Sequence, residues 1–329
     1  MPFVKIDDTL DMYYEDDNFT DPWRDGIETV VLHHGNSKNT KLWYAWVPLL
    51  CRQYRVIRLD ARGFGQSSVP PEGYDWSLSN WGTDLLKLLD LLGIDKVHLV
   101  GETVGGTIAL QFAYEHPERL HTLTTCTSPY KFAGVDMYQQ YYNLVSEEGV
   151  AAWVNKTAER RLEPGKSDPD HHNWYIDQMS QTSKRVVLES LAYLGTQDLT
   201  DILPQIQTPA MVLVSEQSAK ESSERTTVFA EKLGNGRLVT IPGSGGYVQH
   251  SAPEACVLAW RQFLGEVSGK CFQIDLDFPG GHRLGSLCNP RLDLMVRQWL
   301  RIWIFYRFAI VHHLPNAKFR FQTCEPIKF

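Results

Sequence analysis

The stretch 97–116 combines a buried strand, a sharp turn and a helix around a single hydroxyl side chain. Its apolar start, Val97-His98-Leu99-Val100, predicts a strand, and the spacing of Ile108, Leu110 and Phe112 predicts a helix. The turn between them reads Gly-x-Thr-x-Gly-Gly. Small flanking residues let the backbone pass close to itself and hold the central side chain out at the end of a sheet. The sequence therefore predicts a nucleophile elbow with Thr103 at its apex, where the usual motif has serine.

Two interpretations of Thr103 stand side by side. Threonine has a hydroxyl group that serves as a nucleophile in some enzymes. The apex of an elbow, however, usually has a strained backbone, which costs a β-branched residue on the order of 1–3 kcal/mol. In the alternative interpretation, Thr103 is a relaxed turn residue whose hydroxyl bonds locally.

The elements that position this turn alternate between strands and helices. Apolar runs predict strands at 28–34, 54–59, 97–100, 120–127, 210–214 and 237–241, and helical patterns occupy 81–92, 226–233 and 253–264. This alternation predicts an α/β fold with a mostly parallel central sheet flanked by helices. Residues 130–200 instead predict helices rich in Tyr and Trp, interpreted as a helical cap over the carboxyl edge of the sheet.

The expected domains follow from this pattern. Residues 1–129 and 201–266 form the α/β core, residues 130–200 form the cap insertion, and residues 267–329 form a poorly packed C-terminal extension. Within that extension, 292–311 is very apolar but carries three arginines, Arg297, Arg301 and Arg307, which argue against a membrane span. A basic amphipathic helix that contacts a membrane weakly, or a partner, is the alternative there.

Composition sets bounds on partners and location. The 329 residues are 43% hydrophobic and 22% charged, and the net charge of -7 gives no reason to expect nucleic acid as a partner. The six cysteines are scattered without metal-type spacing and are interpreted as free thiols in a reducing compartment. The N-terminus has no long apolar run and predicts no signal peptide. We expect a cytoplasmic protein without a metal or organic cofactor.

Residues 28–266 resemble the α/β-hydrolase superfamily, in particular its esterase and lactonase branch, which includes 3-oxoadipate enol-lactonase. The resemblance rests on landmarks that occur in the family's order. They are His34-Gly35, the run Asp60-Ala61-Arg62-Gly63-Phe64-Gly65-Gln66-Ser67, the elbow, His116-Pro117-Glu118-Arg119, Thr208-Pro209 and Pro253-Glu254. The resemblance implies an α/β-hydrolase fold and hydrolysis of an ester or lactone in small-molecule, including secondary, metabolism.

The resemblance also implies a Ser, an Asp or Glu, and a His in that chain order. This chain has Thr103 at the nucleophile position, Ser218 at the acid position and Gly246 at the histidine position, with six residues between Gly246 and Pro253 as in relatives. All three triad positions are therefore substituted. His250, four residues after Gly246, is a candidate displaced base if the loop is rebuilt, and a surface histidine is the alternative.

Substrate contacts are expected on the other side of the elbow. The backbone amides of Asn36 and Val104 stand where relatives place their oxyanion donors. His34 flanks them and is a candidate substrate contact, with a purely structural role as the alternative.

Three functions remain open at this point. The first is an ester or lactone hydrolase in which Thr103 supplies the hydroxyl and His250 or His34 the base. The second is a non-hydrolytic enzyme, a cyclase, dehydratase or C–C lyase, that uses the same pocket. The third is a ligand-binding or inactive paralogue. In each case the aromatic-rich cap favours a small, apolar or aromatic molecule as ligand.

Overall fold

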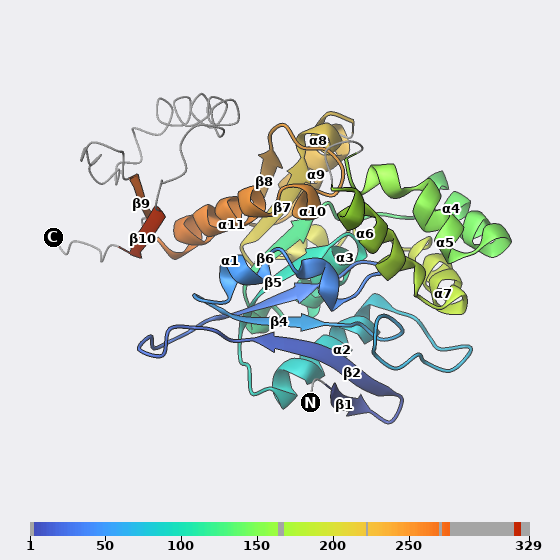
Figure 1. Ribbon diagram of the computed structural model, residues 1–329, viewed down its shortest axis with the longest axis horizontal. Coiled ribbons are helices and arrows are strands. Elements are labelled where there is room, and N and C mark those ends of the chain that lie inside the picture. Colours follow the sequence, from blue (N-terminus) through green and yellow to red (C-terminus); the bar gives the residue numbers. More distant parts are fainter. Residues whose placement is uncertain (1–2, 164–167, 222, 270–271, 277–318, 324–329) are drawn as a thin grey trace. The chain divides into compact units, whose positions relative to one another are not determined.

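The computed structural model describes residues 3–163, 168–221, 223–269, 272–276 and 319–323 (Figure 1). The chain divides into two compact units, 1–260 and 261–329. The predicted membrane or partner contact by 292–311 lies outside the described residues. Within the described part of the chain, no helix has the length and apolar character needed to cross a bilayer.

An eight-stranded sheet forms the centre of the first unit, with strand order β1-β2-β4-β3-β5-β6-β7-β8. Strands β1 and β2 form an antiparallel hairpin, β2 pairs antiparallel with β4, and the remaining neighbours are parallel. The strands are β1 (Phe3–Asp7), β2 (Leu10–Asp17), β3 (Thr29–His33), β4 (Arg55–Leu59), β5 (Val97–Glu102), β6 (Leu120–Cys126), β7 (Ala210–Ser215) and β8 (Gly236–Ile241). The predicted mostly parallel α/β sheet is confirmed.

Helices connect these strands and cover both faces of the sheet (Figure 1). The α-helices are α1 (Val47–Leu50), α2 (Leu78–Leu91), α3 (Val104–Glu115), α4 (Asp136–Glu148), α5 (Val150–Lys156), α6 (Pro169–Ser180), α7 (Lys184–Leu194), α8 (Glu216–Glu221), α9 (Ser223–Lys232), α10 (Val248–Ser251) and α11 (Pro253–Ser268). Short 3-10 helices lie at η1 (Thr40–Trp43), η2 (Pro117–Arg119), η3 (Ala158–Arg160) and η4 (Leu203–Gln205).

The sequence explains why the central strands are where they are. Every residue of β3 and of β5 is buried, as expected for parallel strands covered on both faces. On α2, Leu78, Trp81 and Leu85 recur at helical spacing and are buried. The Ser77 side chain caps this helix by accepting a hydrogen bond from the Asn80 amide. Periodicity and capping thus agree with the observed boundaries.

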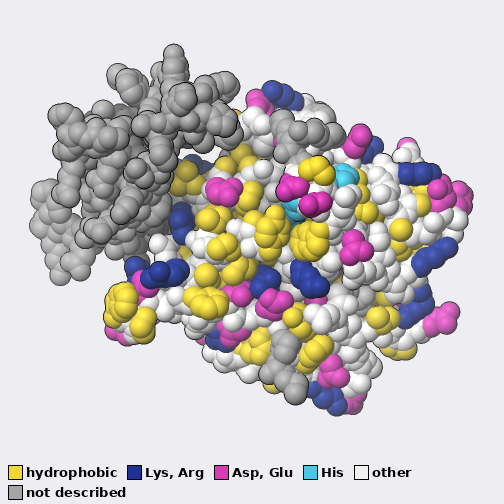
Figure 2. Space-filling view, in the orientation of Figure 1, with side chains coloured by type: hydrophobic (Ala, Val, Ile, Leu, Met, Phe, Trp, Pro, Cys, Tyr) yellow, Lys and Arg dark blue, Asp and Glu magenta, His cyan; other side chains and the backbone are white. Residues whose placement is uncertain are grey.

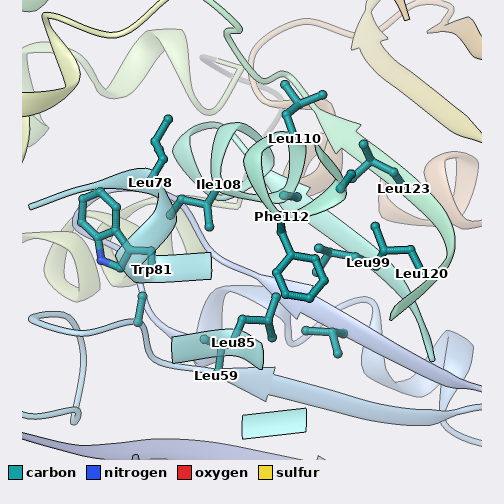
Figure 3. Close-up of a cluster of buried hydrophobic side chains, with 14 of the residues drawn as sticks. Leu59, Leu78, Trp81, Leu85, Leu99, Ile108, Leu110, Phe112, Leu120 and Leu123 are labelled. Carbon is teal, nitrogen blue, oxygen red and sulfur yellow. The ribbon is translucent and has the colours of Figure 1, made fainter. Parts of the chain in front are cut away.

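One apolar core cluster lies between the sheet and the helices α2 and α3 (Figure 3). Trp81 and Leu85 of α2, Phe112 of α3 and Leu99 of β5 belong to it, and the last three are fully buried. Burial of side chains of this size contributes about 1.5–3 kcal/mol each. The core therefore fixes α3, and with it the turn at Thr103, against the end of β5.

Helices α4 to α7 follow β6 and precede β7 along the chain, and in Figure 1 they gather on one side of the sheet. They share a second cluster of buried apolar residues, which includes Trp153, Tyr175, Met179 and Leu191. The helices expected within 130–200 are thus present, and their treatment as a separate cap domain stays a prediction.

The face of the protein shown in Figure 2 carries acidic and basic side chains interspersed with apolar ones. In the second unit, β9 (Phe272–Leu276) pairs antiparallel with β10 (Phe319–Thr323).

Candidate active site

Thr103 occupies a strained turn between β5 and α3. Its φ of 48° and ψ of -118° lie outside the regions that β-branched residues normally adopt. The interpretation of Thr103 as a relaxed turn residue is therefore wrong, because the core holds both flanking elements and leaves no room for an extended turn. A Cβ atom at Gly35 would lie 1.8 Å from Thr103 Oγ1, so only glycine fits beside the hydroxyl. Within the described residues this hydroxyl makes no hydrogen bond, which contradicts the expected local bond.

Asn36 and Val104, whose backbone amides are the expected oxyanion donors, line the same cavity as Thr103. Val104 is the first residue of α3, and Asn36 follows β3 in the neighbouring loop. The first amides of a helix have no intrahelical acceptor and carry the positive end of the helix dipole. The Asn36 side chain is held by the hydroxyls of Ser190 at 3.1 Å and Ser37 at 3.0 Å, which fixes the loop. This arrangement can stabilise a negatively charged oxygen above Thr103.

A cavity of about 810 Å³ lies above these groups. Its aromatic lining comes largely from the helices after β6 and includes Tyr138, Tyr141, Trp153 and Tyr247. Charged side chains also line it, namely Lys38, Glu159, Arg160 and Arg161. A volume of this size accommodates a small-molecule ligand.

Ser218 stands where the triad of the α/β-hydrolase superfamily has its acid, and it brings no carboxylate to the cavity lining. Ser218 does line the cavity, and its hydroxyl bonds to that of Ser215 at 2.9 Å. Glu216 begins the short helix α8 and accepts a hydrogen bond from the Gly243 amide at 2.7 Å. It also forms an ion pair with Lys220 at 2.9 Å. Glu216 is therefore occupied by its own surroundings rather than directed at Thr103.

The histidine position is closed to an imidazole. Gly246 lines the cavity with a φ of 57°, a conformation that favours glycine. A Cβ atom there would lie 2.7 Å from the carbonyl oxygen of Arg161. The neighbouring Tyr247 amide donates to that same oxygen at 2.9 Å. The segment at Arg161 thus fills the space that a side chain at 246 would need.

His250 is buried, so its interpretation as a surface histidine is wrong. Its exposed fraction is 9%, because α10 turns the ring inward, and Nε2 lies 2.7 Å from Glu102 Oε2. The ring is thus held by Glu102, the residue before Thr103, and it does not belong to the cavity lining. Burial lowers the pKa of His250, although the Glu102 charge opposes that shift. Its role as a displaced base stays a prediction that this geometry does not favour.

A buried ion pair at Lys38 and Glu102 was missed by the sequence analysis. Lys38 Nζ lies 2.5 Å from Glu102 Oε2, and both side chains have exposed fractions of 1% or less. The same oxygen accepts from Gln249 at 2.6 Å and contacts His250 at 2.7 Å. Within the described residues, Glu102 Oε1 has no hydrogen-bond partner. The only signal in sequence was a carboxylate at the end of an apolar strand, which needs a partner once buried.

The surroundings of Lys38 shift its proton affinity. Burial lowers the pKa of Lys38 to about 8, against the opposing pull of Glu102. The ammonium also lies 4.7 Å from the ring centroid of Tyr247 and 5.7 Å from that of Tyr175. Burial raises the pKa of Glu102, but the charges of Lys38 and His250 outweigh it and hold that pKa well below its usual range. Lys38 is thus a cavity-lining amine that titrates near neutral pH.

His34 does not line the cavity, so its predicted substrate contact is not supported. Its Nε2 accepts from the Ala61 amide at 2.9 Å, which leaves Nδ1 to donate to the Gly35 carbonyl at 2.6 Å. Burial, with the neighbouring His33, lowers the pKa of His34 to about 3. A neutral ring that joins two loops is the structural role given as the alternative. Among the described residues no group of His, Cys, Asp or Glu is arranged to hold a metal ion.

The comparisons with known proteins agree with this architecture. A family model described as alpha/beta hydrolase fold matches residues 28–253. The chain is 29% identical to 3-oxoadipate enol-lactonase 1 of Acinetobacter baylyi, over 56% of this chain and 69% of the relative. It is 25% identical to a fluoroacetate dehalogenase of a Burkholderia species, over 75% of this chain and 90% of the relative.

A solved structure extends the agreement to the backbone. A thermophilic esterase from Thermogutta terrifontis superimposes with a TM-score of 0.69 at 26% identity, covering 78% of this chain and 94% of the esterase. Relatives with the names lactonase, dehalogenase and esterase share one scaffold, so the residues of the site must decide the reaction.

Proposed function

The chain belongs to the alpha/beta hydrolase fold family, and from this premise we propose that it hydrolyses a small-molecule ester or lactone in the cavity above Thr103. The observation that carries the proposal is the strained backbone of Thr103, with φ of 48°, beside Asn36 and Val104 in the lining of the same cavity. Such strain costs on the order of 1–3 kcal/mol and persists where it serves a mechanism. The esterase and enol-lactonase names of two similar proteins support the same reaction class.

Lys38 is the proposed proton acceptor in place of the missing imidazole. It lines the cavity together with Thr103, and its partner Glu102 directly precedes Thr103 in the chain. Ser–Lys pairs perform this task on other folds. When Lys38 gives up its proton, Glu102 keeps Gln249 and His250 as partners. The amine can therefore exist in its neutral form without leaving the carboxylate alone.

The proposed reaction follows from these positions. The Lys38 amine accepts the proton of the Thr103 hydroxyl while Oγ1 forms a bond to the carbonyl carbon. The carbonyl oxygen becomes negatively charged and accepts hydrogen bonds from the Asn36 and Val104 amides. As the carbon–oxygen ester bond breaks, the Lys38 ammonium returns the proton to the leaving oxygen. A water molecule then attacks the threonyl ester by the same steps and releases the acid.

The closed histidine position favours a second candidate function. Gly246 leaves no room for the imidazole of the family's triad, and this supports a non-hydrolytic enzyme or a ligand-binding protein. In either case the cavity would be retained and the covalent step lost.

Turnover measurements separate the two functions. We expect the wild type to hydrolyse p-nitrophenyl acetate or a small lactone, and Thr103→Ala to lose on the order of 10⁶-fold in kcat, as nucleophile removal does elsewhere. Thr103→Ser should retain turnover, and Thr200→Ala, which removes a hydroxyl outside the cavity lining, is the matched control. Turnover that survives Thr103→Ala, or none in the wild type, would refute the hydrolytic function and leave the second candidate.

The pH dependence tests Lys38 as the base. The pKa of Lys38 is lowered to about 8, and only the neutral amine accepts a proton. We therefore expect log(kcat/KM) to rise with pH and to level off above an apparent pKa of about 8. A limb centred below about 6.5, the ordinary value of histidine, would indicate His250 instead, because burial lowers the pKa of that ring.

The cavity lining, the buried cysteines and the surface charges support an apolar or aromatic ligand and a cytoplasmic location. The aromatic lining of the cavity supports a ligand with an apolar or aromatic body, as in secondary metabolism. The free cysteines Cys51, Cys126 and Cys256 are all buried, which supports a reducing, cytoplasmic location. Mixed charges on the face in Figure 2 support a small molecule rather than nucleic acid as partner.

A further inference from the structure

Arg161 brings a positive charge into the wall of the cavity. Its exposed fraction is 3% and it lines the cavity. Within the described residues no carboxylate lies at ion-pair distance from its guanidinium. An arginine keeps its charge at every physiological pH. Burial of an unpaired charge is unfavourable, so a partner for this guanidinium is expected.

The contacts that Arg161 does make leave one edge of the guanidinium unused. Nη1 donates to Thr157 Oγ1 at 2.6 Å and to the Val154 carbonyl at 3.2 Å, near the end of α5. The guanidinium carbon lies 5.1 Å from the Trp153 ring centroid. These neighbours offer dipoles and a π-face but no net negative charge. Nε and Nη2 make no hydrogen bond to any described residue, and together they present two parallel donors.

The other charged groups of the lining balance each other. Lys38 is paired with Glu102 at 2.5 Å. Glu159 and Arg160, adjacent in the chain, are both exposed and of opposite sign. Arg161 therefore leaves the buried part of the wall with one net positive charge. A planar oxyanion with one negative charge matches the single positive charge of Arg161. It also matches the pair of donors Nε and Nη2, since carboxylates bind arginine in that bidentate geometry.

We propose that Arg161 binds a carboxylate of the ligand, so that the protein takes a small molecule with an apolar or aromatic body and one carboxylate. This inference rests on the proposed use of the cavity as a ligand site and names the chemical class of that ligand. Trp153 and Tyr141 line the cavity together with Arg161 and would contact the apolar or aromatic body of the ligand. The backbone of the same arginine closes the histidine position at Gly246.

Binding to a matched pair of probes tests the proposal independently of turnover. Naphthylacetate and naphthylacetamide have the same shape and differ in charge, and their affinities are measured by titration calorimetry. We expect the wild type to bind the carboxylate about tenfold or more tightly than the amide, as a charge-assisted hydrogen-bond pair gives. Arg161→Met should lose this preference, while Lys156→Met, an exposed cation of α5 outside the cavity lining, should keep it.

The outcomes separate this inference from the proposed hydrolysis. Preferential binding of the carboxylate without turnover of any ester would sustain the inference and refute the hydrolytic function. Equal affinity for the two probes, or no binding of the carboxylate, would overturn the inference even if esters are hydrolysed. If Arg161→Met does not fold, Arg161→Gln provides a second variant that must also lose the preference.

Discussion

Replacement of Lys38 by methionine should strongly destabilise the fold, because it leaves Glu102 charged and buried. Lys38 Nζ lies 2.5 Å from Glu102 Oε2, and both side chains are almost completely buried. At this separation two unit charges attract by roughly 6–7 kcal/mol at an effective dielectric constant near 20, and the cost of taking both charges out of water offsets part of that attraction. Removal of one partner from a buried pair typically costs about 3–5 kcal/mol. Such a loss is a large part of a total stability of about 5–15 kcal/mol.

The loss should depend on pH through His250, which contacts the same carboxylate oxygen. In the wild type, burial lowers the pKa of His250 and the Lys38 charge adds to that shift, so Lys38→Met raises this pKa. A protonated His250 then supplies the missing positive charge at low pH. The folded variant binds more protons than the unfolded chain, so its stability falls as pH rises through that pKa. The destabilisation should be larger near pH 7.5, where Lys38 of the wild type is still mostly charged, than near pH 5.5.

Urea unfolding at the two pH values measures this effect. With an m-value of about 3 kcal/mol/M, the expected loss near pH 7.5 shifts the midpoint by about 1–2 M. Lys38→Met combined with Glu102→Gln should recover much of the loss, because no charge is then left unpaired. Lys87→Met, a cation exposed by 43% and 4.0 Å from Asp7, is the matched control, with an expected change below about 0.5 kcal/mol. A loss below about 1 kcal/mol, or one that is independent of pH, would refute the reasoning.

Two backbone predictions concern the turns of the site. Thr103→Gly should raise the free energy of unfolding by about 1 kcal/mol, because relief of about 1–3 kcal/mol of strain exceeds the entropic cost of glycine. Thermal unfolding checks this, and a lower unfolding midpoint in the variant would contradict the assigned strain. Gly246→Ala should cost about 1–3 kcal/mol, because its Cβ meets the Arg161 carbonyl at 2.7 Å. Gly243→Ala, with a similar φ of 68° and no atom within 4 Å, should cost less in the same assay, and equal losses would show that φ alone decides.

The sequence by itself determined the frame of this protein. Apolar runs at 28–34, 97–100 and 210–214 predicted buried parallel strands, because strands covered on both faces must be apolar throughout. The glycines around Thr103 predicted the elbow, because a tight strand-to-helix turn allows no larger side chain. The substituted positions Ser218 and Gly246 were found by counting along the chain, since the landmarks that flank them are local.

Only the tertiary structure decided what surrounds the elbow. Lys38, Glu102, His250 and Arg161 come from four separate segments, and no local pattern states that they meet. Burial turns the first three into one charged cluster, and Arg161, with no carboxylate at ion-pair distance among the described residues, keeps a charge for a ligand to match. The conformation of Thr103 was also beyond the sequence, because propensity favours a relaxed threonine while packing of β5 and α3 imposes φ of 48°. Local patterns specify elements, but the long-range packing of those elements sets the charge and strain of the site.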